Sequence, residues 1–147
     1  TYSRDKLSLG TLPSRLPTAL QALLVGVQAE QTATRRSAID GVSALDAVKR
    51  FQLLEPLLAA LVRQPHGNAL IGAVELAERA PDTAADVVKA LARVPPAAIP
   101  PTQITAVVRR IPADTPGLTE LLDAWQSSDD SAVSTMTRTA RSAQGRR

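Results

Sequence analysis

The amino-acid sequence predicts an all-α protein of about seven to eight short helices stacked as antiparallel pairs, either an α-solenoid-like array or an irregular helical bundle. Three observations predict this class. The apolar residues are mostly Ala, Leu and Val, and Ala and Leu favour helices. Aromatic residues make up only 2% of the chain, which disfavours strands. Eleven prolines divide the 147 residues into short segments, and apolar residues recur at helical spacing within these segments.

The first three helices are expected before residue 65. Pro13 and Pro17 open the first, a second runs from about residue 35 to 50, and a third covers the leucine-rich segment with Pro56 in its first turn. The inward-facing residues of these helices are predicted to be Leu20, Leu23, Leu24, Val27, Ile39, Val42, Leu45, Val48, Leu53, Leu54, Leu57, Leu58 and Leu61. The segment 53–62 is apolar on more than one side, which predicts a helix buried on two faces or an oligomer contact.

Four further helices are predicted between residues 68 and 126. Asn68 and Asp82 are the expected caps of the first two, proline pairs at 95–96 and 100–101 separate the second from the third, and Asp114 with Pro116 starts the fourth. The inward-facing residues are predicted to be Leu70, Ile71, Val74, Ala77, Val87, Val88, Leu91, Val94, Ile104, Val107, Val108, Ile111, Leu118, Leu121, Leu122 and Trp125.

One domain fits the length, because a hydrophobic fraction of 44% supplies enough apolar side chains for one core. We expect this helical domain to cover residues 1–126. From Ser127 onward the chain is rich in Ser, Thr, Asp and Arg. Residues 127–147 are therefore predicted to be a polar, arginine-rich, flexible C-terminal tail, with a last frayed helix capped at residues 129–130 as the alternative.

Apolar triplets recur along the chain at a constant interval, which indicates a repeated two-helix unit. A set of apolar pairs recurs at nearly the same interval between the triplets. Helices of similar length can also fall into such a register by chance, so both explanations stay open. The triplets are Leu53, Leu54, Leu57; Val87, Val88, Leu91; and Leu121, Leu122, Trp125, and the pairs are Ile39, Val42; Ile71, Val74; and Ile104, Val107.

The segment Ala80–Leu91 resembles the turn and second helix of a HEAT or armadillo-like repeat. It has a Pro-Asp turn before a helix with Val, a basic residue and an Ala-Leu pair. The turn at residues 112–114 is similar, but its helix lacks the basic residue. The earlier unit lacks the Pro-Asp turn. The resemblance is one of architecture, and it implies an array that binds other macromolecules along a concave face.

The side chains needed for catalysis or metal binding are scarce. The chain has no cysteine, and the single histidine, His66, lies in a predicted turn. Seven glycines are scattered singly, so no phosphate-binding loop is predicted. Glu75 and Glu78 share a helix face and are expected to be solvated. We therefore predict no enzymatic activity and no catalytic, cofactor or metal site.

Basic residues are the candidate contact residues of this chain. Helix-end pairs suit the helix dipole, but together they could also form a stripe for an acidic partner or for phosphates. This stripe would consist of Lys49, Arg50, Lys89, Arg93, Arg109 and Arg110. A second group of contacts is expected from the tail, at Arg138, Arg141, Arg146 and Arg147.

The location of the charge separates two functional hypotheses. The isoelectric point of about 9.9 suggests nucleic-acid binding. However, four of the 17 Lys or Arg lie in residues 134–147, whereas all 14 Asp or Glu lie before them. The preferred hypothesis is a non-enzymatic protein-interaction, scaffold or regulatory module, which could also form a homo-oligomer. The alternative is a nucleic-acid-associated regulator with a helical body and a basic tail.

The sequence favours an intracellular location. No apolar stretch approaches the roughly 20 residues that a membrane-spanning helix needs, and no signal-peptide pattern is present. We therefore expect a cytoplasmic protein without a membrane partner.

Overall fold

The computed structural model describes residues 16–145, and this part of the chain is helical without any strand. It contains eight α-helices and two short 3₁₀ turns, η1 (Pro81–Thr83) and η2 (Pro96–Ala98). The predicted all-α class with about seven to eight helices is confirmed. The helices are α2 (Thr18–Val27), α3 (Thr32–Ser43), α4 (Ala47–Arg63), α5 (Asn68–Arg79), α6 (Ala84–Ala92), α7 (Pro101–Arg110), α8 (Leu118–Gln126) and α9 (Ser131–Gly145).

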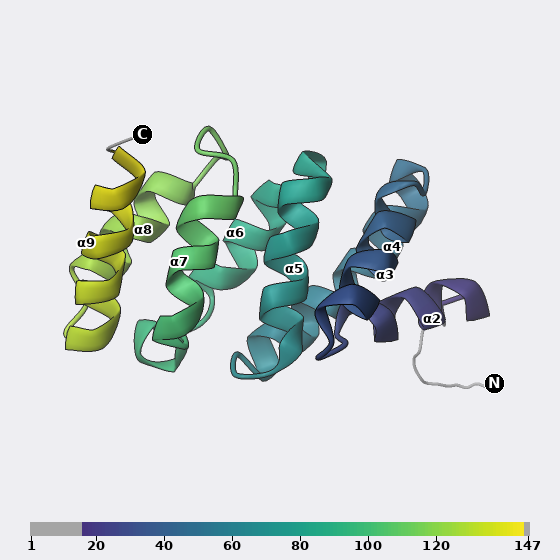
Figure 1. The fold of residues 1–147 in the computed structure, drawn as a ribbon, viewed down its shortest axis with the longest axis horizontal. Coiled ribbons are helices and arrows are strands. Elements are labelled where there is room, and N and C mark those ends of the chain that lie inside the picture. The colour runs from purple at the N-terminus through teal and green to yellow at the C-terminus, as the bar shows by residue number, and fades with distance from the viewer. Residues whose placement is uncertain (1–15, 146–147) are drawn as a thin grey trace.

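The helices form an elongated stack of two layers (Figure 1). Helices two apart in the chain lie side by side, so α3, α5, α7 and α9 form one layer and α2, α4, α6 and α8 form the other. From α4 to α9, consecutive helices run in opposite directions, whereas α2 is inclined to the rest. No helix of the described residues is long and apolar enough to cross a membrane.

The two apolar sets of the sequence fall on the two layers. The recurring triplets lie on α4, α6 and α8, and all their side chains are buried. The recurring pairs lie on α3, α5 and α7, and only Ile71 among them is partly exposed. The interval at which the apolar sets recur in the sequence is therefore the number of residues from one helix of a layer to the next helix of that layer.

The boundary between α3 and α4 differs from the prediction of one helix over residues 35–50. The chain leaves the helix after Ser43 and re-enters it at Ala47, because the side chain of Asp46 accepts a hydrogen bond of 2.9 Å from the Lys49 amide. Pro56 consequently lies inside α4 and not in a first turn. The break also changes the helical register, so Val48, predicted to face inward, is 70% exposed.

Residues Ser131–Gly145 are helical in the structure, whereas a flexible tail was expected over residues 127–147. Asp130 caps α9 by accepting a hydrogen bond of 3.0 Å from the amide of Val133. Val133, Thr137 and Ala140 are buried against the stack, and the Thr137 hydroxyl donates to the carbonyl of Val133 at 2.7 Å. The array therefore extends past the predicted limit at residue 126.

Three residues with predicted roles lie outside the described part of the chain. Pro13 was expected to open the first helix, and Arg146 and Arg147 were expected to contribute contacts from the tail. Their predicted roles stay predictions.

Gly72 allows α5 to approach the end of α2 closely. A Cβ atom at this position would clash with the carbonyl oxygen of Val27 and would lie 2.9 Å from its Cγ1. The Val27 side chain is completely buried, so it has little room to move away.

We expect Gly72→Ala to lower the free energy of unfolding by about 1–3 kcal/mol, because the overpacking outweighs the higher helix propensity of alanine. Urea denaturation followed by circular dichroism measures the change. Gly145→Ala is the matched control, because a Cβ atom there meets nothing within 4 Å. Equal stability of the two variants would show that the α2–α5 contact is not close-packed in solution.

Candidate interaction surface

An apolar groove opens on the layer that contains α6 and α8. It has a volume of about 550 Å³. Trp125, Val88 and Leu121 are buried at its base, and Ala92 and Ala124 lie exposed along it. The groove, called the α6/α8 groove below, is lined by Val88, Lys89, Ala92, Val94, Pro96, Pro116, Gly117, Glu120, Leu121, Ala124 and Trp125.

The chain turns into α8 through Gly117, and this turn shapes one wall of the groove. Gly117 has a φ of 86°, in the left-handed region that favours glycine. Its missing Cβ atom would lie 3.3 Å from Cγ1 of Val88. The sequence prediction placed Pro116 at the first helical position, but the structure starts α8 at Leu118. Pro116 is therefore free to line the groove.

A second groove, called the α4/α6 groove below, lies on the same layer and has a volume of about 370 Å³. Lys89 lines both grooves. The α4 side of the α4/α6 groove is largely apolar, while the α6 side carries three charged residues. The lining residues are Phe51, Leu54, Glu55, Leu58, Asp86, Lys89, Ala90 and Arg93.

Among the predicted contact residues, Lys49, Lys89 and Arg93 are exposed, but Arg50 is engaged in the fold. The Arg50 guanidinium donates to Asp82 at 2.7 Å and to the carbonyl of Leu45 at 2.6 Å, and its side chain is only 13% exposed. Arg50 thus closes the α3–α4 connection and joins it to η1.

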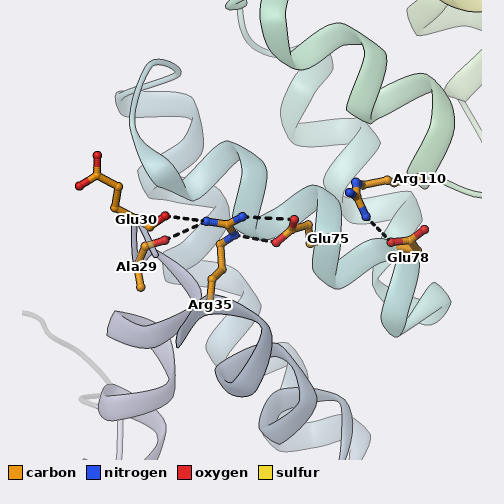
Figure 2. A network of polar contacts seen from close by, with 6 residues as sticks. All are labelled: Ala29, Glu30, Arg35, Glu75, Glu78 and Arg110. Carbon is orange, nitrogen blue, oxygen red and sulfur yellow. Dashed lines mark hydrogen bonds and ion pairs between the residues drawn. The ribbon is translucent and has the colours of Figure 1, made fainter. Parts of the chain in front are cut away.

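Arg109 and Arg110 lie on the opposite layer, on α7. They line a third groove of about 380 Å³ together with Glu78, Thr102, Thr105 and Ala106. Nη1 of Arg110 donates to Oε1 of Glu78 at 2.8 Å (Figure 2). These two arginines are therefore on one layer, whereas Lys49, Lys89 and Arg93 belong to the other.

The tail arginines within the described residues lie on α9. Arg141 donates to Oδ1 of Asp123 and to Oε1 of Gln126, both at 2.9 Å, and thereby fastens α9 to α8. Arg138 is exposed. Arg141, which was predicted to contact a partner, therefore has a role in the fold.

A buried ion pair joins α3 and α5, and sequence reasoning did not find it. Nε of Arg35 donates to Oε1 of Glu75 at 2.6 Å and Nη2 donates to Oε2 at 3.3 Å (Figure 2). Nη1 of Arg35 also donates to the carbonyls of Ala29 and Glu30, at 3.1 and 3.2 Å. Glu75 was expected to be solvated, but its position in an α5 that is apolar on nearly every side was a usable signal.

Side chains that could ligate a metal ion do not gather within residues 16–145. No group of three or more His, Cys, Asp or Glu residues in that part of the chain could hold a metal ion. His66 is exposed in the turn between α4 and α5.

Comparisons with protein-family models, with curated proteins and with solved structures find no match to this chain.

Proposed function

We propose that this protein is a non-enzymatic protein-interaction module that binds a short apolar segment of another protein in the α6/α8 groove. The observation that carries the proposal is the groove itself, which has a volume of about 550 Å³. Exposed Ala92 and Ala124 and buried Trp125 line it. Binding sites for peptides and small molecules are typically concave, largely apolar and flanked by a few polar groups. Lys89 and Glu120 are the charged residues of this groove.

The two-layer architecture supports a scaffold or regulatory role that also depends on binding another protein. We propose that the array works as HEAT and armadillo-like arrays do, by presenting neighbouring helices of one layer to a partner. Two features support this: helices two apart stack side by side, and the Pro-Asp turn at residues 81–82 forms η1 directly before α6.

Nucleic-acid binding is the second candidate function, and the charge distribution disfavours it. Residues 1–133 carry one more acidic than basic residue. Arg50, Arg110 and Arg141 are engaged in ion pairs within the fold. A nucleic-acid interface usually needs an excess of positive charge along one face.

We expect peptides selected from a phage-displayed random library to bind the α6/α8 groove, and we expect Ala92→Glu to weaken their binding at least tenfold. A carboxylate at this exposed position places charge at the apolar groove, where an apolar ligand leaves it poorly solvated. Fluorescence anisotropy with labelled peptides gives the affinities. Trp125 is the only tryptophan of the chain, so its emission reports whether the peptide occupies the groove.

Ala132→Glu is the matched control, because Ala132 is equally an exposed alanine but lies on α9 outside the groove. Circular dichroism melts establish that both variants are folded. If the selected peptides bind Ala92→Glu and Ala132→Glu equally well, or if the selection enriches no groove-binding peptide, the proposed function is wrong.

A further inference from the structure

The longest described helix, α4, has a second apolar stripe that residues 16–145 cover only in part. Its buried stripe consists of Leu53, Leu54, Leu57 and Leu61. The second stripe has Val48 and Phe51 exposed at 70% and 37%, and Leu58 and Val62 partly buried. The sequence predicted either a helix buried on two faces or an oligomer contact for residues 53–62, and Leu58 and Val62 on the second face of this segment are only partly buried.

The spacing of the second stripe is that of a helix–helix seam. Positions 48, 51, 55, 58 and 62 alternate in steps of three and four, which is the a/d pattern of a helix that packs along another helix. The one polar member of this stripe is Glu55, which lies at its centre and is exposed. A partner helix must therefore meet apolar residues along the seam and place cations near its middle.

The α4/α6 groove provides these cations. Lys89 and Arg93 line it beside Phe51, Glu55 and Leu58. Both cations are exposed, and neither forms an ion pair with a carboxylate of residues 16–145. Asp86 also lines the groove. A helix that enters the groove with an apolar stripe and a central acid would fill it and pair with the two cations.

We infer that the occupant is α4 of a second copy, so that the chain forms a twofold dimer through α4 and α6. The α4 stripe has the chemistry that the groove requires, since apolar residues at seam spacing flank a central carboxylate. In a twofold arrangement Glu55 of each chain meets Lys89 and Arg93 of the other, so every favourable contact occurs twice. The proposed peptide function stays with the α6/α8 groove, which shares only Lys89 with the α4/α6 groove.

Sedimentation equilibrium of the full chain tests this inference. We expect a mass twice the 15.5 kDa of the monomer at micromolar to sub-millimolar concentration, and dissociation that increases with salt. Val48→Glu should raise the dimer dissociation constant at least tenfold. Val25→Glu is the matched control, because Val25 is 72% exposed on α2 and should leave the dimer unchanged.

A charge exchange tests the twofold register. Glu55→Arg alone and Lys89→Glu with Arg93→Glu should each raise the dissociation constant at least tenfold, and the combined triple variant should restore dimerisation. Monomer at every concentration, equal effects of Val48→Glu and Val25→Glu, or no restoration in the triple variant would each overturn the inference. A different protein captured by a photo-crosslinker at position 48 of a monomeric chain would assign the stripe to that protein instead. Peptide binding by Val48→Glu reports separately on the α6/α8 groove.

Discussion

Replacing Arg35 by methionine is expected to lower the free energy of unfolding by about 3–5 kcal/mol, because it leaves the buried carboxylate of Glu75 without its partner. The side chains of Arg35 and Glu75 are only 10% and 8% exposed, so water cannot take over the lost contacts. The carbonyls of Ala29 and Glu30 in the α2–α3 connection lose their donor as well. Urea denaturation gives the loss.

The double variant Arg35→Met with Glu75→Leu should recover most of this stability, since apolar pairs often replace buried ion pairs without loss. Arg79→Met is the matched control. Its ion pair with Asp40 also links α3 to α5, but the two side chains are 61% and 62% exposed, so the expected loss is about 0–1 kcal/mol. Losses of the same size at Arg35 and Arg79 would contradict a buried role for Arg35.

Leu57→Ala is expected to cost about 2–5 kcal/mol, because it leaves a cavity in the middle of the core. Leu57 is completely buried on the inner stripe of α4. Its counterpart in the next triplet, Leu91 on α6, is equally buried and should show a loss in the same range. The dependence of unfolding on urea should keep its slope, because the surface exposed on unfolding hardly changes.

Val48→Ala is the control for this prediction, since it removes apolar atoms from the exposed stripe of the same helix. We expect a change within about 0.5 kcal/mol for the monomer. A loss at Leu57 that does not exceed the loss at Val48 would mean that α4 presents a different face to the core.

The helical class and most of the buried residues could be predicted from the sequence, because each helix buries one stripe at helical spacing. The triplets on α4, α6 and α8 illustrate this, with every member buried. The helix boundary at Asp46 was missed because a single capping hydrogen bond outweighed an apolar spacing that continued to Val48. The spacing of apolar residues alone does not show whether a capping hydrogen bond ends the helix.

The C-terminal helix was missed for a different physical reason. The buried side chains of α9 are small or polar, and Thr137 satisfies its own hydroxyl within the helix. The composition therefore resembled that of a disordered segment. However, Thr137 and Ala140 follow the pair on α7 at the same interval at which that pair follows the one on α5. The period was the better guide to this segment than its polarity.

The candidate surface was only partly predictable. The basic residues were identified from the sequence. However, the layer on which each of them lies depends on which helices pack side by side. Arg35 and Glu75 are far apart in the chain, and only the packing of α3 on α5 brings them together. The α6/α8 groove likewise depends on the left-handed backbone conformation of Gly117, which lies between Pro116 and the start of α8.

Helix α5 contacts α2, α3, α4, α6 and α7, and most of its residues are buried. An array in which each unit touches only its neighbours can lose its ends while its middle persists. Here α5 contacts helices of both layers, so its loss removes the support of every helix from α2 to α7. Amide protons of α5 should therefore exchange with solvent only when the whole chain opens, whereas α8 and α9 can detach as a smaller cooperative unit.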